Sequence, residues 1–122
     1  MRVTEYEQRS PEWYAVRLGI PTASNFARMI TPGGKKSAQI EKYINELVGE
    51  RLTGKTKSIP QNSAMAHGTF MEPFARDYYE FSQDVEVVEV GLCLHDIIDA
   101  GASPDGLVGD DGLLEIKCPP VH

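Results

Sequence analysis

The sequence predicts an α/β chain of the α+β kind, in which helices pack against a β-sheet. Patterns typical of capped helices occupy the chain up to about residue 81. From residue 85 onward the composition changes to the β-branched type that strands prefer. The length of 122 residues suits one modest domain with a single core, so residues 1–122 are expected to form one domain.

Two short helices are expected near the N-terminus. Residues 10–12 read Ser-Pro-Glu, which gives a hydroxyl cap, a proline where no N–H is needed and an acid in the first turn. This helix is expected to end at Gly19. A second helix should open at Thr22 or Ser24 and run through Met29.

Two longer helices should follow. The first is amphipathic, begins at Ser37 and ends at Gly54. The second starts at Asn62 or Ser63, and Pro73 should kink or split it because proline removes a backbone donor. Its aromatic stripe is expected to be core rather than a platform for stacking bases. The stripe comprises Phe70, Phe74, Tyr78 and Phe81.

The last third of the chain is predicted to be strands. Residues 85–90 and 92–98 are expected to form a hairpin, with Gly91 between them. Residues 100–102 are small and should form a strand that leads into Ser103-Pro104-Asp105. The turn-rich segment 106–112 favours another hairpin, which would bring the residues on either side of it together.

Charged residues flank this second hairpin in a pattern typical of a site. Asp105 closes one predicted strand, while Glu115 and Lys117 lie two apart on the next and therefore share a face. The opposite face is apolar, with Leu114, Ile116 and Cys118. Two carboxylates held in this way suit a hard divalent cation such as Mg²⁺. The pattern therefore predicts a metal site rather than a solvated strand face.

Composition limits the class of protein. No apolar run is long enough to span a bilayer and the N-terminus lacks a signal-type segment, so a cytoplasmic location without membrane association is expected. The cysteines, Cys93 and Cys118, are too few for a disulfide framework or a four-cysteine iron–sulfur cluster and are expected to be small buried hydrophobes.

The net charge of −6 is unusual for a protein that binds nucleic acid, although acids gathered at a metal site soften that objection. One third of the chain holds a run of basic residues that is either a DNA-binding strip or a solvated helix face. It consists of Lys35, Lys36, Lys42, Arg51, Lys55 and Lys57.

The two segments around the second hairpin resemble a known nuclease motif. Ser-Pro-Asp-Gly at 103–106 and Leu-Glu-Ile-Lys-Cys-Pro at 114–119 are similar to the PD-(D/E)xK motif as it occurs in the lambda exonuclease and YqaJ-like viral recombinase family. The resemblance implies a restriction-endonuclease-like core, with a mixed central β-sheet flanked by helices. Because family members continue well beyond this motif, the chain is expected to lack the family's C-terminal part.

The resemblance also implies roles for residues that spacing alone would not single out. Trp13-x-x-x-Arg17 followed by Thr-Ala-Ser24 resembles the signature that holds a 5′-phosphate, where Ser103 is expected to contribute as well. Without the resemblance, Trp13, Arg17 and the 22–24 segment would be interpreted as core anchor, surface charge and helix cap.

A second motif of the family concerns Glu72. Gly68-x-x-x-Glu72 resembles the family motif whose glutamate contributes to the metal site. Spacing alone instead places Glu72 away from the buried helix face, in a surface ion pair with Arg76 at i+4. His67 is expected to pack rather than to bind metal, since Mg²⁺ favours oxygen ligands.

The implied function is a Mg²⁺-dependent DNA exonuclease of the phage recombination type, which acts on linear duplex DNA from a 5′-phosphorylated end. Asp105, Glu115, Glu72 and the Ile116 backbone carbonyl would bind Mg²⁺, with Mn²⁺ as a substitute, and Lys117 would position or deprotonate the attacking water. Alternatives are a related endonuclease or repair nuclease, and an inactive truncated module that binds a recombination partner. Partners implied besides DNA are a single-strand annealing protein and, where the full family fold is present, further copies of the chain. A phage origin would place the protein in the host cytoplasm.

Overall fold

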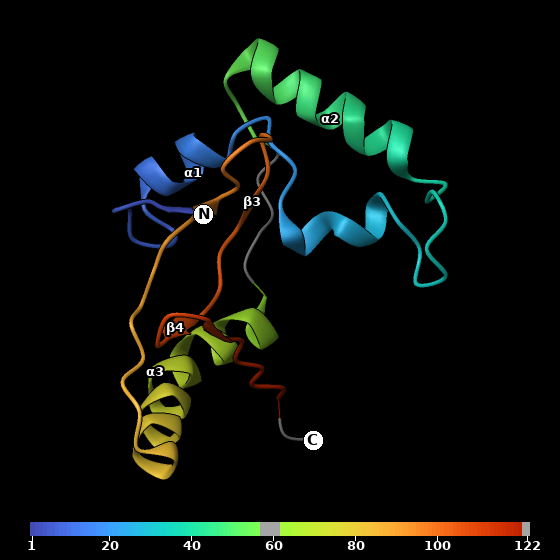
Figure 1. Ribbon diagram of the computed structural model, residues 1–122. Coiled ribbons are helices and arrows are strands. Elements are labelled where there is room, and N and C mark those ends of the chain that lie inside the picture. The colour runs from blue at the N-terminus through green and yellow to red at the C-terminus, as the bar shows by residue number, and fades with distance from the viewer. Residues whose placement is uncertain (57–61, 121–122) are drawn as a thin grey trace. The chain divides into compact units, whose positions relative to one another are not determined.

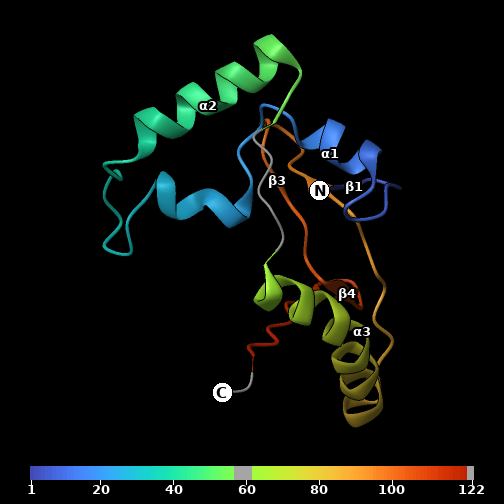
Figure 2. The same cartoon turned by 180° about the vertical axis from the view of Figure 1, so that it is seen from behind.

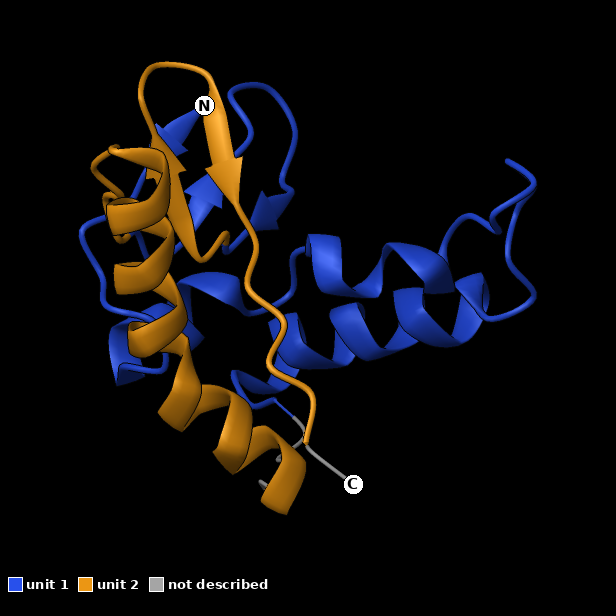
Figure 3. Ribbon diagram, turned by 90° about the horizontal axis from the view of Figure 1, so that it is seen from below, with its two compact units in different colours: residues 1–57, 90–103 blue, residues 58–89, 104–122 orange. Residues whose placement is uncertain are grey.

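The computed structural model describes residues 1–56 and 62–120. Contacts within the chain divide it into two compact units, shown in Figure 3. Unit 1 comprises Met1–Lys57 and Val90–Ser103, and unit 2 comprises Ser58–Glu89 and Pro104–His122. Lys57, which belongs to the predicted basic run, lies outside the described residues. In the described parts of the chain, no helix is long and apolar enough to cross a membrane.

Unit 1 begins its helical part with α1, Pro11–Arg17. The Ser10 hydroxyl caps this helix by accepting a hydrogen bond from the Trp13 N–H at 3.2 Å, as the sequence predicts. The next helix, η1, spans Ala23–Arg28 after the expected cap residue Thr22, but it is a 3₁₀ helix. The expected position is therefore confirmed, with the tighter winding that short helices often adopt.

Helix α2 spans Ile40–Thr53 and ends at Gly54, whose φ of 69° gives the left-handed cap expected there. It begins later than predicted, because the Ser37 hydroxyl accepts the Gln39 N–H and so forms a turn ahead of the helix. The buried side chain of α2 is Tyr43, whose hydroxyl accepts the Thr22 N–H at 3.2 Å. Tyr43 therefore ties α2 to the start of η1.

The sheet of unit 1 has three short antiparallel strands in the order β1-β2-β3. They are β1 (Arg2–Val3), β2 (Cys93–Leu94) and β3 (Gly101–Ala102). Cys93 lies opposite Val3 on one side and Ala102 on the other. Leu92, at the entry to β2, is fully buried and helps to form the core of this unit.

The hairpin predicted from residues 85–90 and 92–98 is wrong. β2 pairs with β1 and β3, while Val88 forms a bridge with Leu107. Gly91 is not a turn residue but a point of close approach, because a Cβ there would lie 1.6 Å from the Tyr6 carbonyl oxygen. The N-terminal segment therefore passes against Gly91, a contact that strand propensity cannot indicate.

Unit 2 is organised around α3, which spans Ser63–Gln83. Of the two expected starting residues, Asn62 is the cap, accepting the Met65 N–H at 2.8 Å, and Ser63 is the first helical residue. Pro73 lies inside the helix and does not split it. The helix ends at Asp84, which adopts a left-handed conformation with φ 52°.

The hairpin of unit 2 is the one predicted between Asp105 and Glu115. Its strands are β4 (Gly106–Val108) and β5 (Gly112–Leu114), paired antiparallel with Gly106 opposite Leu114. β4 lies beside α3 in both views of the molecule (Figures 1 and 2). The α+β class is thus confirmed. Among the described residues, the parallel pairing is an isolated bridge between Thr22, at the start of η1, and Gly101 of β3.

The aromatic stripe of α3 is not core, contrary to the prediction. Its four members are 58–87% exposed: Phe70, Phe74, Tyr78 and Phe81. The face that packs in unit 2 carries Arg76, which is 8% exposed, and Gly68, where an added Cβ would lie 4.0 Å from the Cys118 carbonyl oxygen. A periodic pattern identifies an apolar helix face but not the element that covers it, and here the hairpin packs against the more polar face.

Candidate active site

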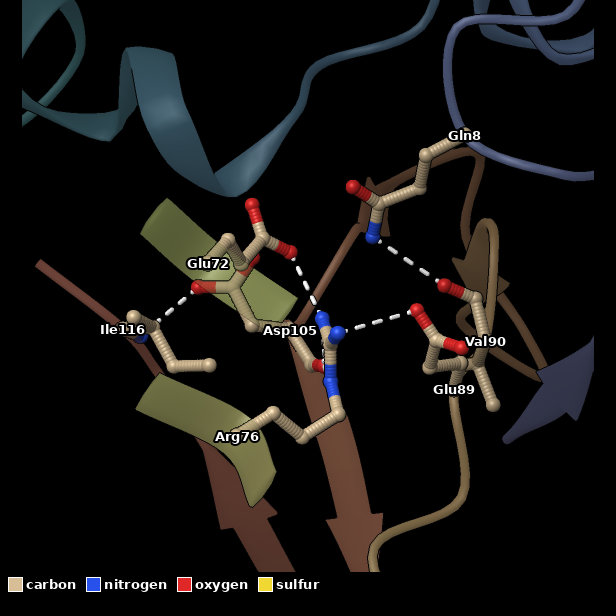
Figure 4. A network of polar contacts seen from close by, with 7 residues as sticks. All are labelled: Gln8, Glu72, Arg76, Glu89, Val90, Asp105 and Ile116. Carbon is tan, nitrogen blue, oxygen red and sulfur yellow. Dashed lines mark hydrogen bonds and ion pairs between the residues drawn. The ribbon is translucent and has the colours of Figure 1, made fainter. Parts of the chain in front are cut away.

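Asp105 links the two ends of the β4–β5 hairpin. Its backbone N–H donates to the Leu114 carbonyl at 2.9 Å. Its carboxylate Oδ2 accepts the Ile116 N–H at 2.7 Å, the bond drawn in Figure 4. The predicted convergence of Asp105 with the 114–118 segment is therefore present. The backbone bond and the side-chain bond together fix the position of the aspartate.

Glu72 lies close to Asp105 through a shared partner, Arg76. The Arg76 Nη2 atom donates to the Glu72 carboxylate at 2.7 Å and to the Asp105 carbonyl at 3.2 Å. The side chain of Glu72 is 19% exposed, so the expectation that it lies away from the buried face is wrong, although its pairing with Arg76 is confirmed. The Arg76 Nη2 atom thus contacts both Glu72, on α3, and Asp105, which directly precedes β4.

Glu115 and Lys117 form an ion pair on the solvent side of unit 2. Their Oε1 and Nζ atoms are 2.9 Å apart, and the two side chains are 59% and 82% exposed. β5 ends at Leu114, so both residues follow the strand instead of lying on it. The period-2 alternation nevertheless persists, because Ile116 and Cys118 are half-buried while Glu115 and Lys117 are exposed. The shared face is confirmed even though the strand is shorter than predicted.

The hydrogen bond to Glu115 and the negative charge of that carboxylate raise the pKa of the Lys117 amine, with a smaller contribution from Asp105. In this arrangement the amine is protonated near neutral pH and acts as a donor.

The predicted metal-binding residues carry ligand atoms of the type that a hard divalent cation binds. Carboxylates of Glu72, Asp105 and Glu115 and the carbonyl of Ile116 offer the oxygen ligands that Mg²⁺ prefers. Within residues 1–56 and 62–120, no group of three or more His, Cys, Asp or Glu side chains is gathered closely enough to hold a metal. Glu72 and Asp105 share Arg76, whereas the carboxylate of Glu115 is paired with Lys117.

A second group of predicted residues assembles within unit 1. The Trp13 indole N–H donates to the Ser103 hydroxyl at 3.1 Å, and the Arg17 guanidinium lies over the Trp13 ring at 4.0 Å. Trp13 is buried, as expected for a core anchor. Arg17 is half-buried rather than a plain surface charge, and burial lowers the pKa of its guanidinium. Its Nε atom is buried without a hydrogen-bond partner among the described residues.

Ser24 stands apart from this group. It is exposed on η1, and its hydroxyl lies 3.3 Å from the Thr22 hydroxyl. The contacts of the described residues thus join Trp13, Arg17 and Ser103 but leave Ser24 with Thr22.

The basic run contains one residue with a structural role. Arg51 donates from Nε to the Gly19 carbonyl at 2.7 Å and lies 3.6 Å from Asp99. The remaining described members are exposed: Lys35, Lys36, Lys42 and Lys55.

The contact network also identifies Arg76, which the sequence presented only as an i+4 partner of Glu72. No sequence signal shows that Arg76 would reach the Asp105 backbone.

Comparison with known proteins places the chain in a family. Residues 12–122 match the family described as YqaJ-like viral recombinase domain. The crystal structure of an alkaline exonuclease, LHK-Exo, from Laribacter hongkongensis is similar, with 48% sequence identity and a TM-score of 0.78 over 90% of this chain and 54% of that chain. LHK-Exo in complex with dAMP gives the same identity and coverage with a TM-score of 0.79.

This chain spans about half the length of those solved structures. No curated protein gave a significant match. The family match nevertheless covers most of the chain and includes every residue of both candidate sites. The chain therefore belongs to the YqaJ-like viral recombinase family.

Proposed function

We propose that this chain is a Mg²⁺-dependent DNA exonuclease of the phage recombination type, which hydrolyses linear duplex DNA from a 5′-phosphorylated end. The observation that carries the proposal is the 48% identity to an alkaline exonuclease over 90% of the chain. A structure of that relative holds dAMP, a deoxynucleoside monophosphate, which is the chemical class that an exonuclease releases from DNA. DNA is therefore the substrate class that fits best.

In this proposal, Asp105, Glu115, Glu72 and the Ile116 carbonyl hold the divalent cation. The bound cation would supply Lewis acidity, which polarises a phosphate and lowers the pKa of water. The hydrogen bond from the Ile116 N–H supports the Asp105 role, because it fixes one carboxylate oxygen and so orients the other. Lys117 follows Ile116 directly, and its amine, protonated in the pair with Glu115, positions the attacking water; it would take up a proton only after leaving Glu115 and losing its own.

The second part of the proposal assigns recognition of the 5′-phosphate to Arg17, Ser24, Ser103 and Trp13. Arginine suits this role because its planar fork binds phosphate through two hydrogen bonds at once. The support here is that Arg17 is held over Trp13 while its buried Nε has no described partner. Trp13 also holds the Ser103 hydroxyl, which precedes Pro104-Asp105 in the chain.

The test is a comparison of DNA substrates with the purified chain. Linear duplex DNA with 5′-phosphate ends should be degraded in Mg²⁺ or Mn²⁺ and should survive when EDTA removes the ions. Covalently closed circular duplex of the same sequence should survive in all conditions. Cleavage of the circle would instead indicate a related endonuclease. Metal-independent binding of DNA or of an annealing protein without cleavage would indicate a non-catalytic module.

A further inference from the structure

We propose that Arg76 is a positioning residue for the metal-binding carboxylates. It would hold Glu72 and Asp105 in the arrangement that a divalent cation needs. This inference rests on the proposed function, and it adds a residue that neither the sequence motifs nor the resemblance assigns to the site.

Arg76 is buried in unit 2. Its side chain is 9% exposed, although it lies on a helix with an exposed aromatic face. A buried guanidinium is costly unless its donors are paired, so an arginine at such a position depends on several acceptors. Arg76 has three of them, all within unit 2: Glu72, Glu89 and the Asp105 carbonyl.

The three nitrogen atoms of the Arg76 guanidinium share these contacts. Nη2 contacts the Glu72 carboxylate at 2.7 Å, and Nη1 contacts the Glu89 carboxylate at 3.1 Å. Nε and Nη2 both donate to the Asp105 carbonyl, at 3.3 and 3.2 Å. The planar fork thus joins α3, the 84–89 segment and the start of the hairpin (Figure 4).

Asp105 connects Arg76 to the rest of the proposed metal site. Arg76 holds the Asp105 backbone, while the Asp105 carboxylate accepts the Ile116 N–H at 2.7 Å. A continuous series of hydrogen bonds therefore runs from Glu72 through Arg76 and Asp105 to Ile116. Three of its four members are proposed ligands, and Ile116 lies between Glu115 and Lys117 in the chain.

The charge of Arg76 also affects the carboxylates of the proposed site. Carboxylates brought close together repel one another, and the repulsion raises the free energy of the ionised site before a cation arrives. The permanently charged guanidinium of Arg76, which contacts the Glu72 carboxylate and the Asp105 backbone carbonyl, offsets this repulsion. Lysine could supply the charge but not the fork, because its single ammonium cannot reach the same acceptors in a fixed plane. The charge and the geometry of Arg76 can therefore be separated by mutation.

The test compares Arg76→Lys with Arg28→Lys. Arg28 is a matched control because it also pairs with a glutamate, Glu46, but lies in unit 1. Calorimetric titration with Mg²⁺ should show an affinity about 10–100-fold weaker for Arg76→Lys, as is typical when a group that orients a ligand is lost. Arg28→Lys should bind Mg²⁺ as wild type does. Wild-type affinity in a folded Arg76→Lys protein would overturn the positioning role.

A second readout separates positioning from general support of the fold and needs no metal. Backbone amide exchange should be several-fold faster at Ile116 in Arg76→Lys, because a loosened Asp105 releases that N–H. The reference is Val87, whose N–H also donates to a carboxylate of unit 2, Glu80, at 2.9 Å. Little change at Val87 would support positioning, whereas equal acceleration at both amides would reduce Arg76 to a structural residue.

Two other outcomes of these experiments would also be informative: wild type that binds no Mg²⁺, and an Arg76→Lys variant that does not fold. If wild type binds no Mg²⁺, the proposed metal-dependent function fails, while the comparison of the two amides still decides the role of Arg76. If Arg76→Lys does not fold, Glu89→Ala replaces it, since Glu89 is 72% exposed and its removal releases only Nη1. That variant should bind Mg²⁺ several-fold more weakly, and unchanged affinity would overturn the proposal.

Discussion

At the scale of single residues, Asp105 has two tasks that substitution can separate. Asp105→Asn keeps an oxygen that accepts the Ile116 N–H but removes the ligand charge, so we expect a folded protein without measurable Mg²⁺ binding or cleavage. Asp105→Ala also loses the acceptor and should lower the free energy of unfolding by about 1–3 kcal/mol relative to Asp105→Asn. Calorimetry and denaturant unfolding measure the two effects. Unchanged Mg²⁺ affinity in Asp105→Asn would exclude Asp105 as a ligand.

Lys117 is expected to affect turnover without affecting metal binding. It is 82% exposed, so Lys117→Ala should fold normally. Loss of a residue that acts on the attacking water typically costs about 10²–10⁴-fold in rate. Lys117→Arg should not restore activity, because the planar guanidinium differs in shape from the compact ammonium that positions the water. Single-turnover rates at saturating Mg²⁺ provide the measurement, and a rate within a few-fold of wild type would leave Lys117 as a partner of Glu115 only.

The sequence predicts that Glu115 and Lys117 share one face, because the alternation of side chains in extended backbone depends only on local conformation. The same reasoning placed Glu72 on the wrong side of its helix, since the face that packs depends on a hairpin that lies more than 30 residues further along the chain. Arg76 could not be predicted as a central residue for the same reason. Its contact with the Asp105 carbonyl is a tertiary contact that no local pattern encodes.

At the scale of elements, helix caps and the local β4–β5 hairpin could be predicted, whereas the long-range strand pairing of unit 1 could not. The predicted caps at Ser10 and Asn62 are confirmed because each depends on an oxygen and an N–H three residues apart. The strand partner of Cys93 was mispredicted because Val3 reaches β2 from the other end of the chain. The starts of these two helices thus follow from local chemistry, whereas sheet order follows from packing.

The junction of α1 with α2 gives a prediction at this scale. Gly19 has φ 70°, and an added Cβ would lie 2.2 Å from the Arg51 Cγ atom, while Arg51 also donates to the Gly19 carbonyl. Gly54 has a similar φ of 69° but open space around it. Gly54→Ala should therefore cost only the backbone term, about 1–2 kcal/mol. Gly19→Ala should cost that amount plus about 1–3 kcal/mol for the overpacked contact.

Denaturant unfolding of the two glycine variants measures this difference. Equal losses of stability would show that Arg51 moves away without cost and that the contact between Gly19 and α2 is not important for the fold. A further variant, Arg51→Ala combined with Gly19→Ala, removes the clash and should recover part of the loss if the contact is the cause.

At the scale of the whole molecule, the nuclease-like motif spans the boundary between the two units. Ser103 is the last residue of unit 1 and Pro104 the first residue of the second segment of unit 2, so the Ser-Pro-Asp sequence joins them covalently. The family could be predicted from the sequence because the motif residues are adjacent or regularly spaced, and the α+β class because helix and strand patterns are local. The division into two units could not, because it depends on which distant segments contact one another.

This division allows end recognition and metal binding to be tested independently, since Arg17 belongs to unit 1 and Glu115 to unit 2. Wild type should degrade linear duplexes with 5′-phosphate ends faster than those with 5′-hydroxyl ends, because a bound phosphate fixes which bond is presented for hydrolysis. Arg17→Ala should lose that preference and keep its Mg²⁺ affinity. Glu115→Gln should lose Mg²⁺ binding, and its binding of 5′-phosphorylated DNA in EDTA should match that of wild type.

Arg17→Ala should lose the 5′-phosphate preference because the Arg17 guanidinium, held over the Trp13 ring, is the charged hydrogen-bond donor of the proposed pocket. Trp13→Phe serves as a graded variant, because it keeps a ring beneath the guanidinium but removes the N–H that holds the Ser103 hydroxyl. It should weaken the 5′-phosphate preference less than Arg17→Ala does. Equal rates on both kinds of end in wild type, or an undiminished preference in Arg17→Ala, would remove the phosphate pocket from the proposal and would favour an endonuclease that needs no DNA end.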